Sequence, residues 1–193
     1  MNGRRALVLG VCLLIGVTAR VAAGDWDLDA LMAARREVRS SSARFVERKY
    51  LRLLMERLES SGRLRYVAPD RLERITEKPA AETFELSGST ITGTQRNGER
   101  YTLSLAEHPE VAALVEGVRA TLAGDLPTLQ RHYAVSLAGD RARWQLRLVP
   151  YEQIVREKID DIVIGGADVF LTTVEVHEKD GDRSEMTIQP DGP

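Results

Sequence analysis

The chain has 193 residues with 27 basic and 29 acidic side chains, which gives a formal net charge of −2 at pH 7. Affinity for nucleic-acid phosphates comes from an excess of lysine and arginine, so this balance excludes nucleic acid as an expected partner. The length is that of one domain with a sizeable core, and no linker, repeat or low-complexity segment divides the sequence.

The N-terminal residues have the order of a secretory signal peptide. Two arginines among the first five residues precede an apolar run over residues 6–17, and mostly small residues follow up to Ala23. The run is shorter than the roughly 20 apolar residues that a membrane span needs, which disfavours an uncleaved anchor. We therefore predict a signal peptide over residues 1–23, cleaved after Ala23 or alternatively after Gly24. The mature domain is then 24–193, in the periplasm of a Gram-negative envelope.

The predicted cleavage changes the chemistry that is available to the mature chain. Cys12, the only cysteine, lies in the removed segment, so no thiol remains for a disulfide, a metal site or a nucleophile. Val11 precedes this cysteine where lipid attachment would favour a small residue, so a lipid anchor is not expected. Removal of Arg4, Arg5 and Arg20 leaves 24 of the 27 basic residues against all 29 acidic ones, a net charge of −5.

The mature chain is predicted to begin with a helix and to continue as a meander of short strands. Over residues 25–38, apolar residues recur at helical spacing, with acids near the front and arginines near the end. From Ser42 onward apolar and polar residues alternate, which is typical of strands with one solvated face. Pro69-Asp70 and Asn97-Gly98 supply turns between strands. Beyond the stretch that begins at Ser42, strands are predicted at 62–68, 72–76, 83–87, 90–94 and 100–105.

Two helices are predicted to interrupt the strands. Residues 109–123 have apolar side chains three and four positions apart, and Gly124 follows as a stop. A second short helix is predicted over 125–131, with Asp125 as its N-cap. Strands then resume, with turns at Gly139-Asp140, at Gly165-Gly166 and at 180–182, while 150–158 is ambiguous. These later strands are predicted at 133–137, 144–148, 159–164, 169–177 and 184–188.

No motif in the sequence indicates catalysis or metal binding. The three histidines, His108, His132 and His177, lack the spacing of metal ligands, and Ser87-Gly88-Ser89 is interpreted as a turn. Asp160 and Asp161 are adjacent on a strand and should point to opposite faces, so they should not share a cation. We expect no catalytic residue, no metal and no cofactor.

The order of elements resembles a known family. The helix, the segments "ARFVERKYL" and "SSGRLRYVAPDRLERIT", the central helices and the tail "DGDRSEMTI" are similar to the periplasmic outer-membrane lipoprotein carrier LolA family. The resemblance is nearest to the LolA-related proteins of aryl polyene and pigment biosynthesis clusters. It implies an α+β, mainly antiparallel fold, in which helices act as a lid over an incomplete, curved β barrel.

The resemblance also implies a function and partners. Members of the family carry acylated lipoproteins from an inner-membrane donor to an outer-membrane acceptor. For this chain it implies a monomeric carrier of an acylated lipoprotein or lipid-like cargo, with transient membrane contact and no enzymatic activity. Where the family has an arginine before the proline of a turn, this chain has Ala68, and Leu72 and Arg74 replace aromatic residues. These departures favour a specialised paralogue.

If the sheet curves as the resemblance implies, one face of each strand points into the cavity. The alternative for each residue is an ordinary filled core, because pattern alone does not distinguish the two. The candidates for the cavity wall are Leu64, Tyr66, Leu72, Phe84, Leu86, Tyr101, Leu103, Leu105, Trp144, Leu146 and Leu148. The candidates for the lid are Val111, Leu114, Val115, Val118 and Leu122.

Other functions stay open at this point. Periplasmic regulators of the envelope-stress type use a similar half-barrel, so a sensor or interaction module is the main alternative. Such regulators join the half-barrel to a second domain, whereas a single domain is expected here. A hydrolase of the same lipid is disfavoured, because no nucleophile and base are paired in the sequence. Four arginines alternate with apolar residues: Arg63, Arg65, Arg143 and Arg147. They are expected on the solvated outer face, with docking to an acidic partner or anionic lipid as the alternative.

Overall fold

The computed structural model describes residues 26–52 and 57–191. The predicted signal peptide, residues 1–23, lies outside these ranges, so its cleavage remains a prediction. Helices in the described ranges are all too short or too polar to cross a bilayer.

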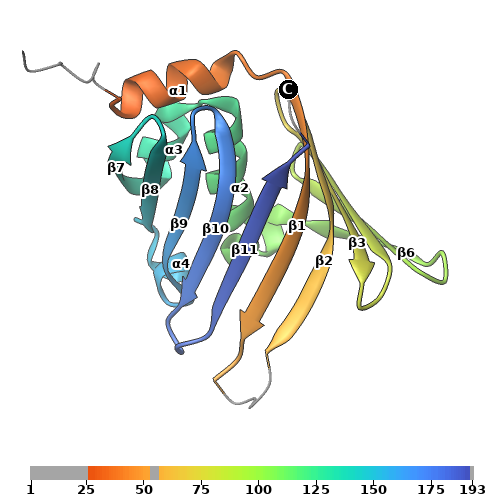
Figure 1. Cartoon of the computed structure of the whole chain (residues 1–193). Helices are drawn as coiled ribbons and strands as arrows, with labels where there is room; N and C mark the ends of the chain where they lie inside the picture. Colours follow the sequence, from red (N-terminus) through yellow and green to blue (C-terminus); the bar gives the residue numbers. More distant parts are fainter. Residues whose placement is uncertain (1–25, 53–56, 192–193) are drawn as a thin grey trace, which may run out of the picture.

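The described residues form one antiparallel sheet of eleven strands, which curves around a set of helices (Figure 1). The first six strands are β1 (Ser40–Tyr50), β2 (Leu58–Val67), β3 (Arg71–Lys78), β4 (Glu82–Ser87), β5 (Thr90–Gln95) and β6 (Arg100–Ser104). The last five are β7 (Tyr133–Asp140), β8 (Arg143–Pro150), β9 (Ile159–Ala167), β10 (Phe170–Glu178) and β11 (Arg183–Pro190). The helices are α1 (Leu28–Arg36), η1 (Leu105–Glu107), α2 (Pro109–Ala123), α3 (Leu126–His132) and α4 (Gln153–Arg156).

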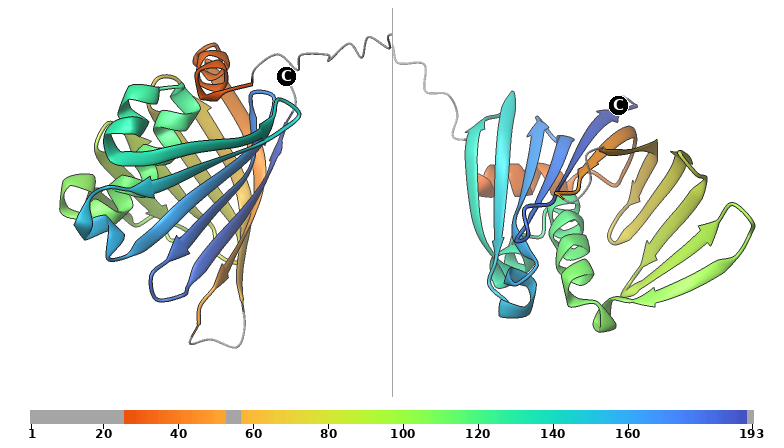
Figure 2. Two further views of the ribbon diagram at one scale, coloured as in Figure 1. Left: turned by 90° about the vertical axis from the view of Figure 1, so that its left-hand side faces the viewer. Right: turned by 90° about the horizontal axis from the view of Figure 1, so that it is seen from below.

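The strand order leaves the sheet open. Strands follow one another as β6-β5-β4-β3-β2-β1-β11-β10-β9-β8-β7, and β1 pairs with β11 so that Phe45 stands opposite Ile188. Within the described residues, the edge strands β6 and β7 do not pair with each other. The chain passes from β6 to β7 through η1, α2 and α3, and α2 lies inside the curve of the sheet (Figure 2). This arrangement confirms the predicted incomplete barrel with helices over its concave side.

The helix boundaries follow from local chemistry. Asp27 caps α1 by accepting a hydrogen bond from the backbone N–H of Ala30 at 2.8 Å. Helix α2 begins at Pro109, whose missing N–H is tolerated there, and ends at Gly124, which adopts a left-handed conformation with φ 68°. Asp125 then caps α3 through the N–H of Thr128. The predicted helices over 109–123 and 125–131 are therefore confirmed, the second shifted by one residue.

The predicted turn at Gly165-Gly166 is wrong. Both glycines lie in β9, where they are buried. A Cβ atom on Gly166 would lie 2.1 Å from Cζ2 of Trp144, so a side chain there would overlap the indole. The glycines thus allow a close approach within the sheet, and the chain turns instead at Asp168, which has φ 51°.

Two smaller differences concern the neighbouring segments. The turn predicted at Gly139-Asp140 falls two residues later, because Asp140 ends β7 and its side chain accepts hydrogen bonds from the N–H groups of Ala142 and Arg143. The ambiguous segment 150–158 contains the short helix α4.

The filled core occupies one part of the concave side. There, α1, α2 and α3 pack against β7–β10 around buried side chains. This core consists of Leu31, Met32, Ala120, Leu126, Leu129, Tyr133, Trp144, Leu146, Leu148, Val155, Ile159, Ile162, Ile164, Leu171 and Val176. The concave side of β2–β5 is less completely covered, and a cavity lies between those strands and α2.

Candidate functional site

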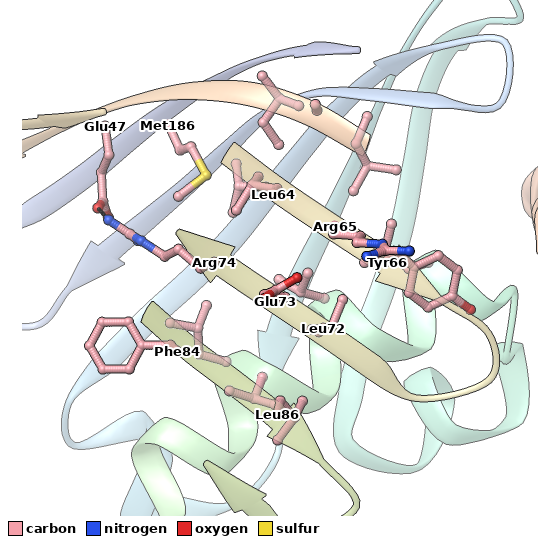
Figure 3. Close-up of a pocket in the computed structure, with 18 of the residues that line it drawn as sticks. Glu47, Leu64, Arg65, Tyr66, Leu72, Glu73, Arg74, Phe84, Leu86 and Met186 are labelled. Atoms are coloured by element: carbon pink, nitrogen blue, oxygen red, sulfur yellow. Dashed lines mark hydrogen bonds and ion pairs between the residues drawn. The ribbon is translucent and has the colours of Figure 1, made fainter. Parts of the chain in front are cut away.

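An apolar cavity of about 370 Å³ lies between the concave face of β1–β5, one side of α2, and strands β10 and β11. This volume is within the range of small-molecule sites in proteins. Figure 3 shows its strand wall, with Leu64, Leu72, Phe84 and Leu86 directed into the same space. The lining is built largely from aliphatic and aromatic side chains, so the cavity suits an apolar ligand.

The strand register explains why these side chains gather. Leu72 stands opposite Tyr66 on β2 and opposite Leu86 on β4, and Leu86 stands opposite Ile91 on β5. Residues directly opposite one another in an antiparallel sheet share a face. A continuous apolar row therefore crosses four strands on the concave side.

Helix α2 supplies the cover of the cavity. Leu114, Val115, Val118 and Leu122 line it, and their spacing of one, three and four residues places them on one side of the helix. Val111, the fifth predicted lid residue, does not line the cavity. It lies in the first turn of α2, next to η1.

The C-terminal end of α2 is anchored by α1. Arg35 is almost fully buried and donates hydrogen bonds to the backbone carbonyls of Leu122, at 2.8 Å, and Val169. Arg36 donates to the carbonyl of Gly124 at 3.0 Å. Burial lowers the pKa of Arg35 to about 10, so its guanidinium stays charged at neutral pH. These two arginines bind the carbonyl end of α2, where the helix dipole favours cations.

Replacing Arg35 with methionine is expected to lower the free energy of unfolding by about 2 kcal/mol, because two carbonyls lose a charged donor in a buried site. Urea unfolding measures this loss, and hydrogen exchange of residues 109–123 should become faster. Arg36→Met is the matched control, and it should cost less because Arg36 is exposed. Equal losses in the two variants would contradict the anchoring role of Arg35.

A polar network interrupts the apolar wall. Nη2 of Arg74 lies 2.7 Å from Oε2 of Glu47, and the hydroxyl of Ser184 donates to Oε1 of the same carboxylate at 2.6 Å. Burial alone would raise the pKa of Glu47, but the charge of Arg74 and the hydrogen bond from Ser184 bring it below its usual value. The carboxylate is therefore ionised at neutral pH.

Of the eleven residues predicted for the cavity wall, five line the cavity: Leu64, Tyr66, Leu72, Phe84 and Leu86. Tyr101 and Leu103 lie on the edge strand β6, where Tyr101 packs edge-on against Phe84 and donates a hydrogen bond to Glu82. Leu105 is buried in η1 and borders a different hollow.

The prediction that placed Trp144, Leu146 and Leu148 in the cavity is corrected. All three are at most 2% exposed and belong to the filled core, because α1, α2 and α3 cover the concave side of β8. Their alternation does correspond to one apolar face of β8. What the face packs against depends on the helices, which the strand's own sequence does not encode.

Several lining residues were not predicted. They come from β5 and from the last two strands, and they include Ile91, Phe170, Leu171, Val174, Val176, Met186 and Ile188. The alternation of Val174 with Val176, and of Met186 with Ile188, was a usable signal. It would have required knowing that β11 pairs with β1, which brings the two ends of the chain together.

A second hollow of about 610 Å³ borders α2 near its first turns, between η1, α3 and β8. Its border includes the charged side chains Glu116, Arg119 and Glu152 as well as His132. The first cavity also borders charged side chains, namely Arg35, Glu47, Lys49, Arg65, Glu73, Arg74 and Glu178. Branched aliphatic side chains nevertheless predominate in its lining, whereas the second hollow has only Leu105 and Val155. The first cavity is therefore the better candidate for an apolar ligand. No group of three or more potential metal ligands occurs in residues 26–52 and 57–191.

Both adjacent aspartates of β9 form ion pairs. Asp161 contacts Arg147 at 2.6 Å and Nδ1 of His177 at 2.5 Å, while the neighbouring Asp160 pairs with Lys179. The two aspartates thus have separate partners, as predicted for adjacent residues of a strand. Arg63 pairs with Glu77 on the solvated face of the sheet. Arg65, which was also predicted for that face, instead borders the cavity.

Comparison with models of known families gives a match. A family model described as outer membrane lipoprotein carrier protein LolA-like matches residues 18–189. A comparison with curated proteins gives no significant match.

The solved structures that match this chain have low sequence identity and TM-scores below 0.5. A LolA superfamily protein from Nitrosomonas europaea is 10% identical, with a TM-score of 0.47 over 86% of this chain and 92% of that chain. A DUF1329 family protein from Desulfovibrio piger is also 10% identical, with a TM-score of 0.47 over 85% and 90%. MucB, in a complex with MucA(peri), is 16% identical, with a TM-score of 0.36 over 88% of this chain and 56% of that chain.

Proposed function

Because the chain belongs to the LolA-like outer membrane lipoprotein carrier family, we propose that it is a carrier that shields the hydrocarbon chain of an amphiphilic cargo. The cargo chain lies in the cavity between α2 and the concave face of β1–β5. The observation that carries this proposal is the row of apolar side chains, Tyr66, Leu72, Leu86 and Ile91, that lines a cavity beneath α2. In this role the protein binds and releases its cargo and catalyses no reaction.

The physical need for such a carrier follows from the hydrophobic effect. Burying a methylene group is worth about 0.8 kcal/mol, so a 16-carbon chain gains about 12 kcal/mol on leaving water. A free cargo of this kind would cross an aqueous compartment too slowly to be useful. A protein that offers an apolar cavity removes most of this barrier.

Cargo entry requires a gap between α2 and the sheet. Most of α2 is only half-buried; its buried residues are Gly117, Ala120 and Thr121, and the last two adjoin the carbonyls held by Arg35 and Arg36. Nearer its N-terminus, α2 is held by the hydroxyl of Tyr133, which donates to the carbonyl of Ala113, so opening must break this hydrogen bond. We infer that α2 pivots at this anchored end and that its N-terminal half moves away from β3–β5. Motions of this kind occur on microsecond to millisecond timescales.

The cellular part of the proposal rests on the sequence. The predicted signal peptide places the protein in the periplasm, where it would take an acylated lipoprotein or an aryl-polyene type lipid from an inner-membrane donor. Delivery to an outer-membrane acceptor would complete the transfer. A monomer with only transient membrane contact fits this role, because the cargo chain is enclosed within one copy of the sheet.

The direct test is recovery of the cargo. The full chain should be expressed with its own signal, purified from the periplasm without detergent, and examined by native mass spectrometry and by lipid extraction. We expect a bound amphiphile at close to one copy per protein. Repeated recovery of protein without lipid would contradict the carrier proposal, and retention of a membrane protein under the same conditions would instead favour the sensor or interaction module.

A further inference from the structure

An ion pair lies in the wall of the apolar cavity. Glu47 on β1 is 7% exposed, and Arg74 reaches it from β3, between Met186 and Phe84 (Figure 3). The guanidinium of Arg74 also lies 4.5 Å from the ring centre of Phe45. The side chain of Arg74 is 28% exposed, so the pair is only partly buried. Ion pairs commonly stabilise a fold little, because the cost of desolvation offsets much of their attraction. Stability alone therefore gives no reason for a charge pair in this wall.

The two partners differ in their remaining hydrogen-bonding capacity. Both oxygens of Glu47 accept hydrogen bonds, from Arg74, Ser60 and Ser184. Arg74 uses Nη2 for Glu47 and Ser60, whereas its Nε lies 3.4 Å from Oγ1 of Thr76, which is a weak contact. Its Nη1 donates to no atom of the described residues and is not among their buried unpartnered atoms. Arg74 thus keeps a donor that is accessible beside the cavity.

The charge of the pair decides which acceptor fits this donor. Glu47 already neutralises Arg74, so a ligand carboxylate placed on Nη1 would also lie close to the carboxylate of Glu47. Like charges at such short range repel, and the apolar surroundings strengthen that repulsion. A neutral carbonyl accepts the same hydrogen bond without this repulsion.

We propose that Arg74, neutralised by Glu47, is the subsite for the neutral ester or amide carbonyl of a cargo whose chain lies in the cavity. This inference rests on the proposed carrier function and deepens it. A hydrocarbon chain that is still attached to a larger molecule is commonly linked through an ester or amide, whereas a detached chain carries a carboxylate. The subsite therefore selects attached acyl chains over free fatty acids.

Competition between matched amphiphiles tests this selectivity. Displacement of a fluorescent apolar probe by dodecanamide, methyl dodecanoate and dodecanoate is measured at a pH where the carboxylate is ionised. For the unmodified protein we expect the amide and the ester to bind about tenfold more tightly than the carboxylate. In Glu47→Gln the preference should reverse, because Arg74 then carries an uncompensated positive charge and attracts the carboxylate.

Two further variants separate recognition from folding. Glu59→Gln is the matched control, since Glu59 also pairs with an arginine, Arg48, at 3.0 Å but is exposed outside the cavity. It should leave the preference unchanged. Arg74→Lys keeps the charge but loses the planar set of donors, so the amide preference should fall even if Glu47→Gln fails to fold.

The outcomes are distinguishable. Equal binding of all three amphiphiles by the unmodified protein, or a preference that neither variant changes, would overturn the subsite while leaving the carrier function standing. Failure of every amphiphile to displace the probe would overturn the carrier function and the subsite together.

Discussion

Replacing Val118 with tryptophan is expected to weaken the binding of a 12-carbon amphiphile by about 100-fold. Val118 lies near the middle of the α2 residues that face the cavity. An indole in this position occupies the space of three or four methylene groups of the ligand. At about 0.8 kcal/mol per methylene, their exclusion removes about 3 kcal/mol of binding free energy. Displacement of a fluorescent probe measures the change in affinity.

The matched control is the same substitution seven residues earlier in α2. Val111→Trp also adds an indole to α2, but Val111 does not line the cavity. We expect its affinity to stay within about threefold of the unmodified protein, with circular dichroism showing that both variants are folded. Similar losses in both variants would show that binding depends on α2 as a whole, and not on the vacant space beneath it.

Much of the fold could be predicted because the local signals agree with one another. The alternation of Leu64 with Tyr66 and the Asn97-Gly98 turn predict strands and a hairpin without tertiary information. Pro109 and Gly124 mark the ends of α2 for the same reason, since their backbone preferences are intrinsic. The turn predicted at Gly165-Gly166 is wrong because glycine occurs both in turns and where the backbone packs closely against a side chain. Only the position of Trp144 in the folded protein decides between the two.

The cavity could be predicted only in part, because it depends on how the helices lie across the sheet. Leu72 and Leu148 have the same alternating pattern, yet Leu72 faces the vacant space and Leu148 the filled core. The partners of the polar residues could be predicted even less well. Arg35 was expected to complement the dipole of its own helix, and the structure shows it bound to the end of α2. Arg74 was noted as a departure from the family, and its partner Glu47 lies 27 residues away in sequence.

The unequal filling of the concave side has a mechanical consequence. Helix α2 packs against the filled core through Ala113, Leu114, Ala120 and Leu122. Leu114 and Leu122 also border the cavity, together with Val115 and Val118. The side of the helix toward β7–β10 is thus held by close packing, and the side toward β3–β5 by contacts across a partly vacant space. Moving α2 away from β3–β5 therefore breaks fewer apolar contacts than moving it away from β7–β10 would.

The filled core and the cavity wall should respond differently when a leucine is replaced by alanine. Leu146→Ala is expected to lower the free energy of unfolding by about 3 to 4 kcal/mol, because Leu146 is fully buried among core side chains and its removal leaves a new void. Leu86→Ala should cost only about 1 to 2 kcal/mol, because Leu86 already borders a cavity that its loss merely widens.

Amphiphile binding should show the reverse order. Leu86→Ala removes wall contacts and should weaken probe binding several-fold, whereas Leu146→Ala should leave the affinity of the folded protein unchanged, since Leu146 does not line the cavity. Urea unfolding and probe titration of both variants give the two quantities. Equal losses of stability at the two positions would mean that the concave side of β1–β5 is packed as tightly as that of β7–β10, and the protein would then have no room for a hydrocarbon chain.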